Sequence, residues 1–147
     1  MPTYACSTAA GRLTPAQKAD IVRSITAIHH EETGAPRYFV QVIFYELAPG
    51  NHFIGGQSAP AGQIWIRGDI RAGRSEEQKR KLISRILRDV SKTSAIAAEE
   101  VWVYLCDIPA HNIAEYGRVL PPPGGETENA WFATLPAALR ERLGPLA

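Results

Sequence analysis

Cysteine is scarce in this chain of 147 residues, which contains only Cys6 and Cys106. Two thiols that are 100 positions apart have neither the spacing of a metal site nor the number that a disulfide framework requires. We interpret both as small buried apolar residues of a protein in a reducing compartment, and we expect a cytoplasmic location.

Long apolar runs and an excess of one charge are also missing. No stretch approaches the roughly 20 apolar residues that span a bilayer, and the N-terminus lacks the charged and apolar segments of a signal peptide. The formal net charge is only +1, which does not favour binding to nucleic acid or to an acidic membrane surface. The four histidines show no spacing typical of a metal site. We therefore expect no nucleic-acid or membrane partner and no metal.

The chain does contain an internal repeat. The segments RLTPAQKADIVRSI and GRSEEQKRKLISRI align at an offset of 61 residues, which matches Thr14 with Ser75. Carried outward without gaps, the offset matches Thr3 and Tyr4 with Ile64 and Trp65. It predicts two copies of one unit, at residues 2–46 and 63–107, followed by a tail at 119–147. The tail is too short for a second domain, so we expect a single domain over residues 1–147.

Each unit reads as strand, helix, strand. The helices begin with the capping boxes TPAQ and SEEQ and then carry one apolar stripe each, formed by Ile21, Val22, Ile25 and Ile28, and by Leu82, Ile83, Ile86, Leu87 and Val90. The segments YFVQVIF and VWVYL have the β-branched and aromatic residues of strands. Because strand–helix–strand crossovers are usually right-handed and parallel, we predict an α+β fold. Its four-stranded, mostly parallel sheet carries two helices on one face.

The other sheet face would then remain apolar and uncovered, with Trp102 and Ile43 directed toward it. A face of this kind usually marks an oligomer interface.

Positions at which the two units differ are candidates for function. Arg71 and Arg74 in IRAGRS match Ala10 and Leu13, and they flank Gly73. They precede a helix N-terminus, which favours anions, and two guanidinium groups there suit a carboxylate. The alternative is a pair of solvated loop arginines.

Four other residues are each ambiguous when taken alone. His29 lies on the apolar stripe, where the second unit has Val90, and could be a core residue. Tyr104 reads as a packing aromatic beside Trp102, and Glu115 in AEYGR as a surface glutamate. Pro2 is either the first residue of an edge strand or, if Met1 is removed, a free secondary amine.

Taken together, these residues resemble the tautomerase superfamily, whose fold is a duplicated β-α-β unit and whose catalytic group is an amino-terminal proline. Within it the chain is most similar to the cis-3-chloroacrylic acid dehalogenase group, through MPTY, LTPAQK, VQVIF, IRAGRS, VWVY, PAHNIAEYGR and WF. The resemblance implies that Pro2, Tyr104 and Glu115 are catalytic and that His29, Arg71 and Arg74 bind the substrate carboxylate.

The resemblance also implies an activity. Glu115, oriented with Tyr104, would activate water that adds to C3 of a cis-3-haloacrylate, and protonated Pro2 would donate a proton to C2. No cofactor is implied, and a homotrimer is expected. Two alternatives remain, namely a phenylpyruvate-type keto–enol tautomerase and a cytokine-like binding protein with the same fold.

Overall fold

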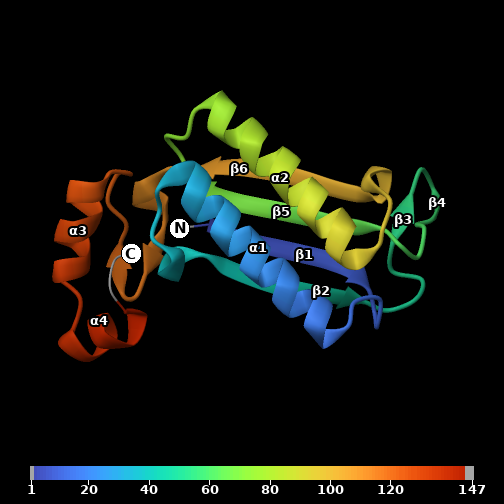
Figure 1. The fold of residues 1–147 in the computed structure, drawn as a ribbon, viewed down its shortest axis with the longest axis horizontal. Coiled ribbons are helices and arrows are strands. Elements are labelled where there is room, and N and C mark those ends of the chain that lie inside the picture. The colour runs from blue at the N-terminus through green and yellow to red at the C-terminus, as the bar shows by residue number, and fades with distance from the viewer. Residues whose placement is uncertain (1, 145–147) are drawn as a thin grey trace.

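One mixed sheet forms the centre of the molecule. The structure is a computed structural model that describes residues 2–144. Strands β1 (Pro2–Ala9), β2 (Gln41–Leu47), β5 (Ile64–Arg71) and β6 (Val101–Ile108) pair in the order β2-β1-β5-β6. Helices α1 (Pro15–Thr33) and α2 (Glu76–Ser94) cross one face of this sheet (Figure 1). The two outer pairs are parallel and the central pair is antiparallel, which confirms the predicted α+β architecture.

Smaller elements lie at the two ends of the sheet. Strands β3 (Phe53–Ile54) and β4 (Gln57–Ser58) form a hairpin at one end, and β7 (Ala114–Glu115), β8 (Arg118–Val119), α3 (Gly125–Ala133) and α4 (Ala137–Leu143) gather at the other (Figure 1). Short 3-10 helices, η1 (Arg37–Phe39), η2 (Ala98–Glu100) and η3 (Ala110–Asn112), precede β2, β6 and β7. Among residues 2–144, no helix is long and apolar enough to cross a membrane.

Both predicted capping boxes are present, and each also joins the two helices. The side chains of Thr14 and Ser75 accept from the backbone N–H groups of Gln17 and Gln78, whose side-chain oxygens accept in turn from the backbone N–H groups of Thr14 and Ser75. The side-chain NH₂ group of Gln78 also donates to the carbonyl of Glu32 at 2.9 Å, and that of Gln17 donates to the carbonyl of Thr93 at 3.2 Å. The start of each helix is therefore fixed to the last turn of the other.

The main core lies between the helices and the sheet. It contains the predicted stripe residues Ile21, Ile25, Ile28, Leu82, Ile86 and Val90, together with Tyr4, Cys6 and the inward side chains of β5. Val22 does not belong to it, because its side chain is on the solvent side of α1 and is 36% exposed. Cys6 is buried as expected, whereas Cys106 is only half-buried.

The gapless repeat alignment is wrong by one residue in the first strand of each unit. The helices do match at an offset of 61, but the loop at 10–14 is one residue longer than the loop at 72–75. Strands β1 and β5 therefore match at an offset of 62, and both alternate with every second residue buried. Because a one-residue slip exchanges the two faces of a strand, the earlier alignment paired inward with outward residues. Arg71 consequently matches Ala9, and it is the last residue of β5 and not a loop residue.

The tail packs onto the rest of the chain through a second apolar cluster. Leu120, Trp131 and Leu135 are buried against Phe39 of η1. The stretch AALRERL forms α4, and α3 precedes it. The tail thus covers the end of the sheet at which β2 begins.

The sheet face opposite the helices is uncovered in the single chain. Trp102 is 39%, Tyr104 50% and Tyr45 51% exposed. The predicted open face is therefore present, although it also carries the Arg67–Asp69 ion pair beside Tyr104 and is not wholly apolar.

Candidate functional site

The strand order brings several of the predicted site residues to one end of the sheet. Because β1 and β5 are antiparallel, the first residue of β1 lies beside the last residues of β5. Pro2 is opposite Ile70, directly before Arg71, and Thr3 is paired with Gln41 at the start of β2. Pro2 is buried. Met1, and with it the predicted removal of this residue, lies outside the described residues.

Arg71 lies deep in this end of the molecule and has two partners from the tail. Its side chain is fully buried and forms an ion pair with Glu128 of α3 through Nη2. Its Nη1 donates to the carbonyl of Pro121 at 2.9 Å. Its Nε–H group is buried and has no protein partner among the described residues, so Arg71 retains one buried donor directed at no acceptor.

Arg74 lies in the loop between β5 and α2. It donates from Nη1 to the carbonyl of Thr33 at 3.3 Å, at the end of α1. Burial, reinforced by the positive charge of Arg71, lowers the pKa of Arg74. The Nε–H group of Arg74 is also buried without a partner in the described part of the chain. Two neighbouring guanidinium groups thus each have one buried N–H without a partner among residues 2–144, which is uncommon in folded proteins.

Gly73 explains how the tail can close over this loop. Its φ of 108° is a conformation that favours glycine. A Cβ atom at this position would lie 2.9 Å from Cγ of Pro123, so the absence of a side chain allows the tail to approach.

His29 completes the polar group at the end of α1. It is 1% exposed, and its Nδ1 lies 2.9 Å from the hydroxyl of Tyr4. Burial, with the charges of Arg74 and Arg71 acting in the same direction, lowers the pKa of His29 to about 3. The imidazole is therefore neutral near pH 7. His29 can therefore contact a substrate carboxylate, as the sequence predicts, but it does so as a neutral hydrogen-bond donor and not as a third cation beside Arg71 and Arg74.

The Tyr4 contact also assigns the tautomer of His29. Burial raises the pKa of Tyr4 well above its usual value, so the phenol keeps its proton. The hydroxyl proton of Tyr4 has an acceptor if it is donated to Nδ1 of His29. Nδ1 then carries no proton of its own, and the imidazole proton lies on Nε2. His29 then offers an Nε2–H donor.

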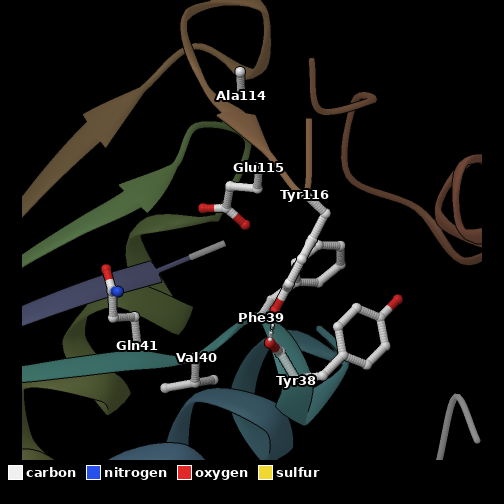
Figure 2. A pocket seen from close by; sticks show the side chains of 7 residues that line it. All are labelled: Tyr38, Phe39, Val40, Gln41, Ala114, Glu115 and Tyr116. Atoms are coloured by element: carbon white, nitrogen blue, oxygen red, sulfur yellow. Dashed lines mark hydrogen bonds between the residues drawn. The ribbon is translucent and has the colours of Figure 1, made fainter. Parts of the chain in front are cut away.

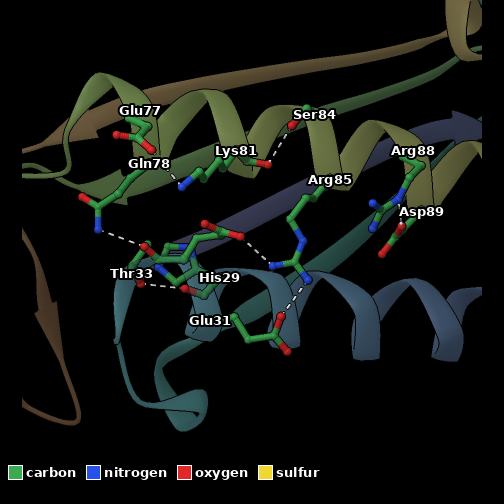
Figure 3. A network of polar contacts seen from close by, with 11 residues as sticks. His29, Glu31, Thr33, Glu77, Gln78, Lys81, Ser84, Arg85, Arg88 and Asp89 are labelled. Atoms are coloured by element: carbon green, nitrogen blue, oxygen red, sulfur yellow. Dashed lines mark hydrogen bonds and ion pairs between the residues drawn. The ribbon is translucent and has the colours of Figure 1, made fainter.

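A polar network holds the end of α1 in place (Figure 3). Arg85 of α2 contacts Glu31 and Glu32 at 2.6 Å each. The hydroxyl of Thr33 donates to the carbonyl of His29 at 2.6 Å. The position of His29 therefore depends on contacts between the two helices.

Glu115 lies in a pocket of about 520 Å³ on the tail side of the same end. The pocket is lined by Tyr38, Phe39, Val40, Gln41, Ala114, Glu115 and Tyr116, and Figure 2 shows the Glu115 carboxylate directed into the space above Gln41 and Val40. Burial raises the pKa of Glu115 to about 7, although the charge of Arg71 acts in the opposite direction. A carboxyl group with this pKa can both accept and release a proton near neutral pH.

Tyr104 does not join this group within one chain. It lies on the open sheet face, with its ring centroid 5.8 Å from that of Trp65. It is paired with Arg67, four residues before Arg71, which corresponds to about 13 Å along the strand. Tyr104 lines a separate pocket of about 310 Å³ beside the β3–β4 hairpin. The structure thus separates Tyr104 from Glu115.

Sequence reasoning missed two residues of the site. Tyr4 reads as a core aromatic. Gly68 in the middle of β5 was an available signal, because a glycine inside a strand often marks the close approach of another group. A Cβ atom at Gly68 would lie 2.6 Å from the Tyr4 ring. Glu128 lies in the tail, which has no repeat partner for comparison, and no sequence signal indicated its contact with Arg71. Among residues 2–144, no three His, Cys, Asp or Glu side chains cluster closely enough to hold a metal ion.

Comparisons with known proteins identify the family. Residues 1–134 match the sequence family described as "Putative oxalocrotonate tautomerase enzyme". The crystal structure of N1, a member of the cis-3-chloroacrylic acid dehalogenase family, is 43% identical with a TM-score of 0.90, over 96% of this chain and 97% of that one. The chain belongs to the tautomerase superfamily, an enzyme superfamily, and it groups with the cis-3-chloroacrylic acid dehalogenases.

More distant structures share the fold. A fused 4-OT symmetric trimer named Q0 is 25% identical with a TM-score of 0.73, over 80% of this chain and 94% of that one. An asymmetric trimer named R7 is 26% identical with a TM-score of 0.72, with the same coverage. No curated protein sequence matches the chain.

The Tyr4–His29 hydrogen bond yields a testable prediction. Replacing Tyr4 with Phe keeps the ring but leaves Nδ1 of His29 buried without a donor, which we expect to lower the free energy of unfolding by about 1–3 kcal/mol. The variant should also lose the single tautomer, which the nitrogen chemical shifts of labelled histidine report. Tyr45→Phe, on the open face, is the matched control. An unchanged His29 spectrum in Tyr4→Phe would contradict the assignment.

Proposed function

We propose that this protein is a cofactor-independent hydratase and hydrolytic dehalogenase of small cis-3-haloacrylate-like unsaturated carboxylic acids. The observation that carries the proposal is the pair of buried Nε–H groups of Arg71 and Arg74, which have no partner within residues 2–144 and lie at the sheet end where β1 begins. A carboxylate has two oxygens, and each can accept a hydrogen bond from one of these N–H groups. The Nε2–H group of His29 supplies a further, uncharged contact.

The reaction needs an acid and a base on opposite sides of the substrate double bond. Glu115 accepts a proton from water as the water oxygen bonds to C3, and protonated Pro2 gives a proton to C2. The arginines stabilise the negative charge that builds on the carboxylate during the addition. The product carries hydroxyl and halogen on C3, and loss of the hydrogen halide gives malonate semialdehyde.

The surroundings of Glu115 suit the role of base. Its pKa of about 7 makes it a stronger proton acceptor than an exposed glutamate while leaving a large ionised fraction near neutral pH. In this mechanism activity requires the ionised carboxylate. Activity should therefore increase as the pH rises through about 7, until the proton on Pro2 is lost.

Tyr104 can take part only if another copy of the chain supplies it. Its phenol lies on the open face with Trp102 and Tyr45, which is the face that a neighbouring subunit would cover. The trimeric 4-OT relatives favour a homotrimer. In such an assembly Tyr104 of one subunit would orient the water held by Glu115 of another.

Keto–enol tautomerisation is the second candidate, favoured by the description of the matching family as an oxalocrotonate tautomerase. In that reaction Pro2 moves a proton on the substrate, and no water is activated. Glu115 would then have no part in the chemical step.

Glu115→Gln separates these two functions. The amide cannot accept a proton from water, so we expect bromide release from cis-3-bromoacrylate to fall by about 10²–10⁴-fold. The rise of activity around pH 7 should disappear with it. Ketonisation of phenylpyruvate, measured on the same preparation, should fall far less and so controls for misfolding. An equal loss of both activities, or a wild type that releases no bromide, would overturn the hydratase assignment.

The proposed acid also requires that the mature protein begins at Pro2. Proline is small enough to permit removal of the initiator methionine, and only a terminal proline has a basic nitrogen. We expect the intact mass of the purified protein to correspond to residues 2–147. A protein that retains Met1 and still releases bromide would exclude Pro2 as the acid.

Mixed trimers test the contribution of Tyr104. Tyr104→Phe and Glu115→Gln subunits, each of low activity alone, should recover activity when unfolded and refolded together. With random mixing of equal amounts, about a quarter of the sites would combine an intact Glu115 with an intact Tyr104 from a neighbour. Glu115→Gln mixed with itself is the control. No recovery would mean that both residues serve the same chain or that no shared site exists.

A further inference from the structure

We propose that Glu128 restricts the carboxylate site to ligands with a single negative charge, by neutralising one of its two arginines. The inference rests on the proposed function, because it concerns the same Arg71 and Arg74. It adds a residue from the tail that sets substrate selectivity without touching the substrate.

The contact between Glu128 and Arg71 is buried and is not a surface ion pair. Glu128 is 5% exposed on α3, and the Arg71 side chain is fully covered. Salt and water screen such a pair far less than an exposed one. Its effect reaches neighbouring groups, since the Glu128 charge acts to raise the pKa of Arg74, against the stronger effect of burial.

The charges at the arginine end therefore sum to a single positive charge. Arg71 and Glu128 cancel, Arg74 remains, and His29 is neutral. The other ionisable groups of the proposed site are Glu115 and the terminal amine of Pro2, and at the alkaline pH of the test below they add no net positive charge. A carboxylate balances the remaining charge, whereas a doubly charged anion would leave excess negative charge in a buried site, which is unfavourable.

The unused donors agree with this count. Nη1 and Nη2 of Arg71 are bonded to Pro121 and Glu128, which leaves its Nε–H, like that of Arg74, buried without a partner among residues 2–144. Two donors match the two oxygens of a carboxylate.

The test compares binding of propionate with binding of ethylphosphonate, at an alkaline pH where the phosphonate carries two charges and neither ligand is a substrate. Wild type, Glu128→Gln and the control Glu126→Gln are titrated by NMR. Glu126 is exposed on the same helix, so its variant makes the same change of charge outside the site. Each dissociation constant is measured for both ligands.

Wild type should prefer propionate. Removing one negative charge favours a doubly charged ligand about twice as strongly, in free energy, as a singly charged one. We therefore expect Glu128→Gln to shift the propionate-to-ethylphosphonate affinity ratio by about tenfold or more toward the phosphonate. Misorientation of Arg71 would weaken both ligands together and leave the ratio unchanged. An unchanged ratio, or an equal shift in Glu126→Gln, overturns the proposal.

Two further measurements keep the outcomes distinct. Arg74→Ala should weaken propionate binding at least about tenfold. If it does not, the carboxylate site of the proposed function fails, independently of Glu128.

If Glu128→Gln does not fold, wild type alone provides the test. Its affinity for ethylphosphonate relative to propionate should increase when the pH is lowered until the phosphonate carries one charge, and a constant ratio would overturn the proposal.

Discussion

The antiparallel pairing of β1 with β5 is the constraint on which the rest of the site depends. Each strand–helix–strand unit is parallel within itself, and this central pair joins the two units into one sheet. With it, Pro2 lies opposite Ile70 and immediately beside Arg71. The helices follow the same symmetry, since Gln78 fixes the start of α2 to the end of α1 and Gln17 fixes the start of α1 to the end of α2. His29 at the end of one helix and Arg74 before the other are thereby held in a single group.

Local patterns were sufficient to predict most of this fold. The capping boxes, most of the apolar stripes and the strands each depend on a few neighbouring residues and are present. The strand expected at YFVQVIF is wrong at its start, because Tyr38 and Phe39 belong to η1 and β2 begins at Gln41. The register of the first strands was not predictable by the same means. The loop at 10–14 has one extra residue, and a gapless alignment cannot represent a difference in loop length. Val22 shows a second limit, since hydrophobicity alone does not distinguish the edge of a stripe from its centre.

The candidate site was predictable to a smaller extent. Arg71, Arg74, His29 and Glu115 stood out because they differ from the repeat or match a family motif, and the structure gathers them at one end of the sheet. Partners that depend on the tertiary fold were not visible. Tyr4 contacts His29 across 25 residues and Glu128 contacts Arg71 across 57. The pKa of Glu115 likewise results from burial by η1 and β7, which the amino-acid sequence does not specify locally.

The covalent fusion of the two units has a consequence for symmetry. The units are alike in backbone, and the start of β5 corresponds to the start of β1. A nitrogen at the start of β5 is nevertheless an amide within the chain and has no basicity. A polypeptide has a single amino terminus, so linking two copies necessarily leaves one of them without a reactive amine. Under the proposed mechanism only the first unit can supply the amine, whereas the first strand of the second unit ends in Arg71 and supplies a guanidinium group to the same site.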